Sequence, residues 1–300
     1  MRGNNMQNYR SGFVAVIGKP NVGKSSLVNR FVGAKISITS PKPQTTRHKI
    51  HAILTGDNYQ IVFLDTPGIH LPKHLLGERM VRAAENAMKE VDLILFVAEA
   101  TGLTEEDMVV VEKIKNINTP VFVLINKIDK IDSQHKQRMI REMTELHLGK
   151  VFTISALTGE GLSELQELII SQLPEGPQYY PPDMLTDNPE RFVVAELIRE
   201  QALMQTFDEV PHAVNVRVEE MKQRKDRELI DIQATIYVER ESQKGIIIGA
   251  KGVRLKEIAT KARENIEALL GSQVFLQLWV KVRKNWRNSQ DDLHYFGFWE

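Results

Sequence analysis

Short apolar runs alternate with amphipathic segments through the first 173 residues of this chain. The runs are rich in β-branched residues and predict buried strands at 13–17, 61–64, 121–125 and 151–154. Between them, apolar residues recur at helical spacing. Thr104 predicts the N-cap of one such helix, with Met108, Val111 and Ile114 facing inward. Strands that alternate with helices predict a doubly wound, mostly parallel α/β sheet over residues 12–173.

The pattern changes after residue 173, where four prolines fall between positions 173 and 183. Prolines at this density exclude a helix and disfavour a paired strand, so residues 174–190 are predicted to be a linker. Its Tyr179 and Tyr180 are expected to pack on a neighbouring surface. Beyond it, a helix at 192–207, strands at 213–222 and 229–239, a helix at 253–270 and a strand at 274–283 predict a smaller α+β domain over 191–283.

Composition agrees with a two-domain protein of 300 residues. The chain has no cysteine, which excludes disulfides, thiolate catalysis and cysteine-based zinc sites and agrees with a reducing, cytoplasmic location. Residues 1–11 are polar and are expected to be a flexible N-terminus rather than a signal peptide. No run approaches 18 apolar residues, so we expect a soluble chain whose membrane contact, if any, is peripheral.

A glycine-rich motif of the form GxxxxGK[ST] occupies residues 18–25, between a predicted strand and a predicted helix. Backbone N–H groups of such a loop and the positive end of the helix suit phosphate oxygens. Lys24 is expected to reach the β and γ phosphates, and Ser25 to ligate Mg²⁺. The candidate phosphate-binding residues are Gly18, Lys19, Pro20, Asn21, Val22, Gly23, Lys24, Ser25 and Ser26.

The sequence Asn126-Lys127-Ile128-Asp129 follows a buried strand, at the edge where α/β sheets bind ligands. A carboxylate at Asp129 can accept hydrogen bonds from both N1–H and N2–H₂ of guanine, a donor pair that adenine lacks. Asn126, Lys127 and Asp129 therefore predict guanine selectivity. The later triplet Ser155, Ala156 and Leu157 is expected to offer backbone N–H groups to the guanine O6.

A third motif, Asp65-Thr-Pro-Gly68, closes another predicted strand and has the DxxG form of a nucleotide switch. Asp65 is expected to hold Mg²⁺ through water, and Gly68 to offer its amide to the γ phosphate. Thr46, in a loop rich in proline and serine, is the candidate for the second Mg²⁺ hydroxyl. Ile69 stands where a water-orienting glutamine is found in Ras, and His70 is interpreted as a solvated loop histidine with no role.

The order and wording of these motifs resemble a GTPase of the translation-factor-related class. The segments GKPNVGKS, SPKPQTTRH and DTPGIH resemble the Era family in particular. The resemblance implies GTP hydrolysis with Mg²⁺ and cycling between GTP and GDP states, with Lys24, Thr46, Asn21 and Gly68 taking part in hydrolysis. GTPases with an apolar residue after the DxxG glycine and a loop asparagine resemble those that bind K⁺, which implies a K⁺ site at Asn21.

A GxxG turn, Gly249-Ala-Lys-Gly252, follows the apolar residues 246–248 in the second domain. Its glycines allow close approach of a nucleic-acid backbone, and the order of predicted elements matches a type II KH fold. Residues 244–287 hold ten Lys or Arg against three Glu, a local net charge of +7 in a chain of zero net charge. The candidate RNA-binding residues are Lys244, Ile248, Gly249, Ala250, Lys251, Gly252, Arg254, Lys281, Arg283 and Trp286.

The tail 284–300 also resembles the Era C-terminus, which extends the resemblance across nearly the whole chain. Trp286 could stack on single-stranded bases, and packing of the tail on the KH core is the equal alternative. The resemblance implies the 3′ region of small-subunit ribosomal RNA as ligand, the small ribosomal subunit as partner and a monomeric, cytoplasmic chain. The alternative is a GTP-switched adaptor that docks on a protein or on the inner membrane surface, because a basic segment also suits anionic lipid.

Overall fold

The computed structural model describes residues 9–298, which form two compact units. The first unit comprises the described residues up to 37, Thr46–Leu71 and Arg79–Asp187. The second comprises Ile38–Thr45, Pro72–Glu78 and the described residues from Asn188 onward. No helix within the described residues is long and apolar enough to cross a membrane.

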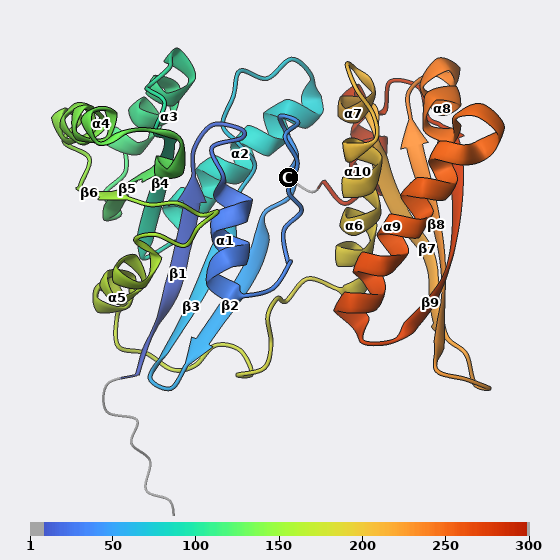
Figure 1. Cartoon of the computed structure of the whole chain (residues 1–300), viewed down its shortest axis with the longest axis horizontal. Coiled ribbons are helices and arrows are strands. Elements are labelled where there is room, and N and C mark those ends of the chain that lie inside the picture. Colours follow the sequence, from blue (N-terminus) through green and yellow to red (C-terminus); the bar gives the residue numbers. More distant parts are fainter. Residues whose placement is uncertain (1–8, 299–300) are drawn as a thin grey trace, which may run out of the picture. The chain divides into compact units, whose positions relative to one another are not determined.

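The first unit contains a six-stranded sheet with strand order β2-β3-β1-β4-β5-β6 (Figure 1). β2 is antiparallel to β3, and the other neighbours are parallel. The predicted mostly parallel sheet is confirmed. The strands are β1 (Arg10–Ile17), β2 (Ile50–Gly56), β3 (Tyr59–Asp65), β4 (Leu93–Glu99), β5 (Val121–Asn126) and β6 (Lys150–Thr153).

Helices connect these strands and bury apolar stripes against them. A large core cluster joins β1, β4 and β5 to α2, α3 and α4. In α3, Val110, Val111 and Ile114 are buried, whereas Met108 is 38% exposed, so the prediction of an inward Met108 is wrong. The buried stripe begins instead at Asp107. The helices are α1 (Lys24–Val32), α2 (Leu75–Lys89), α3 (Glu105–Lys115), α4 (Ser133–Glu145) and α5 (Leu162–Gln172), with the 3₁₀ turn η1 (Ile128–Lys130).

The proline-rich segment after α5 lies along the first unit. The N–H groups of Tyr179 and Tyr180 donate to the side-chain oxygen of Gln60 at 2.8 and 2.9 Å. The Tyr179 ring lies 5.2 Å from that of Phe13, and Tyr180 packs against the core cluster that contains Val62, so the predicted packing of this tyrosine pair is confirmed. At the other end, the predicted flexible segment 1–11 is wrong for Arg10 and Ser11, which belong to β1; residues 1–8 lie outside the described part.

The second unit contains a three-stranded sheet in the order β7-β8-β9. β7 is antiparallel to β8, and β9 is parallel to β8. α6 and α9 lie on one side of this sheet (Figure 1), where the core residues include Leu197, Ile232 and Ile258. The strands are β7 (Asn215–Gln223), β8 (Leu229–Val238) and β9 (Gln273–Val282); the helices are α6 (Glu190–Met204), α7 (Val210–Ala213), α8 (Glu241–Ile248), α9 (Val253–Leu270) and α10 (Gln290–Tyr295), with 3₁₀ turns η2 (Ala250–Gly252) and η3 (Trp286–Asn288).

Helix α8 is the largest element of this unit that the pattern of the sequence did not predict. It contains Gly245 and an unbroken apolar run at its C-terminal end, so it lacks a clear helical stripe. Within the helix, only Gln243 and Ile247 are buried. Helix formation here is decided by packing on α9 and the sheet, which local propensity does not report.

Candidate nucleotide site and nucleic-acid interface

The glycine-rich loop lies between the end of β1 at Ile17 and the start of α1 at Lys24. Gly23 has φ 100°, and a Cβ atom there would lie 2.4 Å from the Asn126 amide nitrogen. A Cβ atom on Gly68 would lie 2.6 Å from the backbone nitrogen of Pro20. Gly23 therefore allows the glycine-rich loop to approach Asn126 of the predicted guanine-binding loop, and Gly68 allows the DxxG segment to approach the glycine-rich loop at Pro20.

Lys24 folds over this loop and is only 6% exposed. Its ammonium group donates to the carbonyl oxygens of Gly18 and Lys19 at 3.0 and 2.8 Å. Burial lowers the pKa of Lys24 to about 8, and the nearby charge of Asp65 opposes this change only in part. An anion in the loop would stabilise the charged form of this lysine.

Three oxygen-bearing side chains meet beside the loop at the predicted Mg²⁺ position. The hydroxyl of Ser25 donates to Asp65 at 2.7 Å and lies 2.8 Å from the hydroxyl of Thr46. Burial raises the pKa of Asp65, and the hydrogen bond from Ser25 and the charge of Lys24 oppose that rise. Hydroxyl and carboxylate oxygens are the donor types that Mg²⁺ prefers, so the residues present fit this ion.

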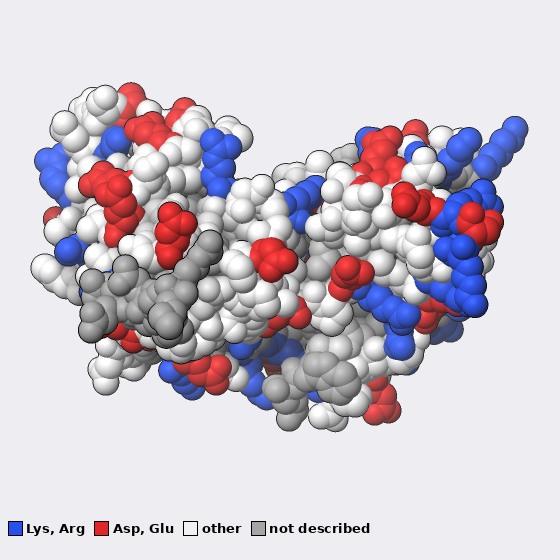
Figure 2. Space-filling model, turned by 90° about the horizontal axis from the view of Figure 1, so that it is seen from below, with Lys and Arg blue, Asp and Glu red and all other residues white. Residues whose placement is uncertain are grey.

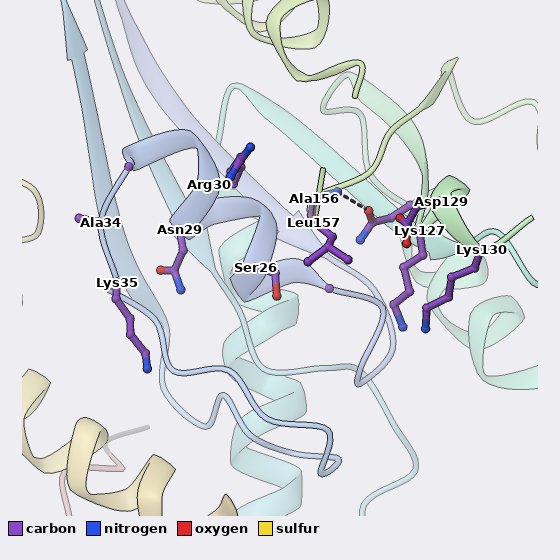
Figure 3. A pocket seen from close by; sticks show the side chains of 13 residues that line it. Ser26, Asn29, Arg30, Ala34, Lys35, Lys127, Asp129, Lys130, Ala156 and Leu157 are labelled. Atoms are coloured by element: carbon purple, nitrogen blue, oxygen red, sulfur yellow. Dashed lines mark hydrogen bonds between the residues drawn. The ribbon is translucent and has the colours of Figure 1, made fainter. Parts of the chain in front are cut away.

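The predicted guanine-binding loops border a cavity of about 620 Å³ (Figure 3). Asn126 is 1% exposed and joins two loops: its amide donates to the Val22 carbonyl at 2.7 Å, and its oxygen accepts from the Ala156 N–H at 3.0 Å, the dashed line in Figure 3. The Ser155 hydroxyl donates to Asp129 at 2.6 Å and fixes that carboxylate. The Ala156 N–H already donates to Asn126. If it also contacts guanine O6 as predicted, this one N–H would be shared between two acceptors.

Two lysines fasten the glycine-rich loop to neighbouring elements, one from outside the loop and one from within it. Lys127 donates to the Asn21 carbonyl at 2.7 Å and forms an ion pair with Glu99 at 2.9 Å. Lys19 forms an ion pair with Asp107 at 2.7 Å, and this carboxylate is fully buried. Neither acid belongs to a nucleotide-binding motif. Nothing in the sequence around Glu99 indicates its role. For Asp107 the sequence indicates only a residue in the first turn of α3.

Sequence reasoning also missed the pocket residues Asn29, Arg30 and Lys35, which line the cavity from α1 and the loop after it. The side chain of Asn29 accepts from the backbone N–H groups of Ile36 and Ser37 at 3.0 and 2.9 Å. It thereby fixes the path of the chain that leaves α1. The sequence offers one signal for Asn29 as a pocket residue: the 3.6-residue period of α1 places it on the same side of the helix as Ser26.

The segment after the DxxG motif differs from its prediction at one residue. Ile69 is fully buried and offers no polar atom to a water molecule, as expected. His70 was expected to be solvated, but its Nδ1 lies 2.8 Å from the Gly68 carbonyl and its Nε2 is buried. The histidine is therefore half-buried and packed against the backbone of its own loop rather than fully solvated.

The GxxG turn joins α8 to α9 in the second unit. Gly249, Lys251 and Gly252 have φ values of 71°, 50° and 80°, so three of the four residues of this tight turn have a positive φ. Lys251 is exposed, while the Arg254 guanidinium donates to the Ile246 carbonyl at the end of α8. Figure 2 shows Lys and Arg side chains gathered on one side of this unit.

Trp286 and Arg283, two further predicted RNA-binding residues, interact with other parts of the second unit. Trp286 is fully buried, its indole N–H donates to the Ala213 carbonyl at 2.9 Å, and its ring lies 5.1 Å from Phe296. The predicted base stacking by Trp286 is therefore wrong, and the tail packs on the KH core. Arg283 donates to Asp292 at 2.6 Å and its guanidinium lies 4.3 Å from the Tyr295 ring, which leaves Lys281 as the exposed cation of β9.

Fold and site together define a P-loop GTPase domain followed by a KH domain. Residues 13–127 match the family model described as a 50S ribosome-binding GTPase, and residues 209–287 match the KH domain model. The chain is 50% identical to the GTPase Era of Alkaliphilus oremlandii and to that of Alkaliphilus metalliredigens over 292 residues, 97% of this chain and 99% of each relative. This chain belongs to the Era GTPase family.

Two solved Era structures have nearly the same fold. One is Era in complex with MgGDPNP and nucleotides 1506–1542 of 16S ribosomal RNA, with 44% identity and a TM-score of 0.94, covering 97% of this chain and 99% of that one. The other is a single-substitution variant of Aquifex aeolicus Era bound to GDP·AlF₄⁻, with 44% identity and a TM-score of 0.93, covering 96% of this chain and 99% of that one.

Proposed function

We propose that this chain is a Mg²⁺-dependent GTP hydrolase that binds the 3′ region of small-subunit ribosomal RNA and acts in assembly of the small ribosomal subunit. The observation that carries the proposal is the joining of Asn126, Val22 and Ala156, which brings the phosphate and guanine loops to one cavity. Bound Mg²⁺ neutralises phosphate charge during hydrolysis. Ser25, Thr46 and Asp65 would hold this ion, and Lys24 would contact the phosphates.

The RNA part rests on the loop between α8 and α9. Residues 242–256 contain four Lys or Arg and no Asp or Glu, and Gly249 and Gly252 place no side chain between the loop backbone and a ligand. A relative bound to 16S ribosomal RNA supports the same ligand class for this chain. The other predicted RNA contacts, at Lys244, Ile248, Ala250 and Lys281, stay predictions.

We also propose that K⁺ accelerates hydrolysis at Asn21. This residue has φ 65°, and Lys127 holds its carbonyl, so the loop is fixed in a conformation that non-glycine residues rarely adopt. Because Ile69 offers no group for water, an additional cation would supply the charge that an arginine finger supplies elsewhere. We further propose a monomeric, cytoplasmic protein; peripheral membrane contact is the alternative reading of the same basic segment.

Binding of the 1506–1542 RNA, measured by fluorescence anisotropy on the full chain, tests the RNA assignment. A Cβ atom on Gly252 would meet nothing within 4 Å, so Gly252→Asp adds a negative charge without a clash, and Gly252→Asn, which tolerates positive φ, is the uncharged control. We expect the Asp variant to bind weakly and the Asn variant to keep most affinity, with GTP hydrolysis unchanged in both. Equal RNA affinity of the two variants would contradict the assignment.

The charge contribution of Lys251 can be separated from general electrostatics. Lys251→Gln should flatten the salt dependence of RNA binding by about one unit of slope, because it removes one phosphate contact. Lys89→Gln, which removes an exposed lysine of α2 in the first unit, is the matched control and should change nothing. Binding to anionic lipid vesicles that depends on Lys251, without RNA binding, would favour the adaptor alternative.

A further inference from the structure

The sheet of the second unit has one covered face and one open face. Helices α6 and α9 pack on the face that carries Ile232, Ala234 and Val280. Because side chains alternate along a strand, Phe275, Gln277, Trp279 and Lys281 of β9 project from the opposite face. All four are exposed, with Phe275 at 47% and Trp279 at 43%. Two large aromatic rings thus lie in solvent on one strand.

The tail covers only part of this open face. Tyr295 of α10 lies 6.4 Å from the ring of Tyr237 and accepts a cation–π contact from Arg217 at 4.0 Å. Further along the sheet, Arg224 lies 5.6 Å from the Phe275 ring centroid. Trp279 has no ring partner within the part of the chain that the structure describes. Its indole is therefore available to a ligand, unlike that of the buried Trp286.

The charge along β9 suits a polyanion. Residues 268–290 contain no Asp or Glu, and the exposed Lys281 and Lys284 form no ion pair with any described residue. Asp231, which lies opposite Phe275 on β8, is paired with Arg224 at 2.6 and 2.7 Å. The exposed Glu219 and Glu220 lie on β7, which β8 separates from β9. Aromatic rings beside unpaired cations, with no acid on the same strand, favour nucleic acid over an acidic protein.

The topology connects this face to the GxxG loop. β9 is parallel to β8, and Val282 lies opposite Val238. Because α8 begins at Glu241, directly after β8, the Lys281 end of β9 is the end of the sheet from which α8 and the loop extend. An RNA strand that leaves the loop at this end would meet Lys281 first, then Trp279, then Phe275.

We propose that Trp279 and Phe275 form a second RNA subsite, on which unpaired nucleobases stack while Lys281 contacts the backbone. The proposal rests on the RNA-binding function proposed above and adds a surface to it. Four residues along a strand span about 13 Å, several times the roughly 3.4 Å between stacked bases. The two rings would therefore accept bases that are not adjacent in the RNA, which requires a longer ligand than the roughly four nucleotides that a KH groove reads.

The test is anisotropy of the full chain with the 1506–1542 RNA, using Trp279→Thr and Phe275→Thr, since threonine suits a strand. Loss of one stacked base is worth about 1–3 kcal/mol, so each variant should bind about 5- to 150-fold more weakly. Trp279→Phe should restore most affinity, and Gln277→Thr, on the same face between the two rings, should bind as the parent does. Trp279 should also account for RNA-induced quenching of tryptophan fluorescence, which Trp279→Phe should lose.

The outcomes separate the two proposals. If the parent chain does not bind the RNA, both are overturned. If Gly252→Asp weakens binding and Trp279→Thr, Phe275→Thr and their double variant bind within twofold of the parent, only the second subsite is overturned, and the open face is left to a protein partner. A urea midpoint equal to that of the parent shows that a weakened variant is folded. If Trp279→Thr is destabilised, the fluorescence of Trp279→Phe tests the second subsite instead: RNA-induced quenching that persists in this variant would overturn it.

Discussion

Replacement of Asn126 by aspartate tests whether this side chain joins the phosphate and guanine loops. The change keeps the shape of the side chain but places an oxygen 2.7 Å from the Val22 carbonyl, where the amide now donates. The bond from the Ala156 N–H is kept. At 1% exposure, water cannot replace the lost donor.

The size of the effect follows from the number of buried groups that lose a partner. One unsatisfied buried carbonyl costs about 1–3 kcal/mol, which corresponds to about 5- to 150-fold weaker nucleotide binding if the penalty falls on the assembled site. Repulsion between the two oxygens adds to this cost. Asn126→Ala leaves both the Val22 carbonyl and the Ala156 N–H without a partner, so it should be more damaging, by about 2–6 kcal/mol in all.

Equilibrium titration with a fluorescent GDP analogue measures the affinity, and urea unfolding measures the free energy of unfolding. Asn116→Asp is the matched control, because Asn116 also donates to a carbonyl, that of Glu112 at 2.7 Å, but at the exposed end of α3. It should bind GDP as the parent does. An Asn126→Asp variant that binds GDP within twofold of the parent would refute the reasoning.

Three further predictions concern the same site. Asp129→Asn should shift preference from guanine to xanthine nucleotides, because the amide restores a complementary donor; phosphate release with each nucleotide measures this, and unchanged preference for GTP would contradict it. K⁺ should accelerate hydrolysis over Na⁺ at equal ionic strength, and Asn21→Ala should remove the difference; identical rates of the parent in both salts would exclude the cation site. The free protein has a Lys24 pKa of about 8, which bound phosphate raises, so binding takes up a proton above that pH. Affinity should be highest below pH 8 and fall about tenfold per unit above it, and calorimetry in two buffers at pH 8 should report roughly half a proton taken up; no uptake would contradict the buried, partly neutral lysine.

The order of strands and helices in the first unit, and most of its nucleotide-binding residues, could be predicted from the amino-acid sequence. The phosphate-binding loop is indicated by glycines at fixed spacing together with a lysine and a hydroxyl residue. Few other residues can replace these glycines, because Gly23 has a positive φ and Gly68 lies close to Pro20. Such local requirements leave a signal at each position. The doubly wound sheet likewise follows from runs of buried strand residues.

The side chains that support these loops, and the choice of which aromatic ring is exposed, depend on how the whole chain packs. Asp107 and Glu99 act on the loop across long sequence separations, and no local pattern distinguishes a buried acid that pairs with Lys19 from a solvated one. Trp279 and Trp286 are seven residues apart in one basic segment, yet one lies on the open face of a sheet and the other in the core. Exposure depends on which elements pack over a residue. The tail folds back onto α7 and β7, where Trp286 donates to the Ala213 carbonyl and Arg217 donates to the Tyr295 carbonyl, and Trp286 is buried while Trp279 on β9 stays exposed.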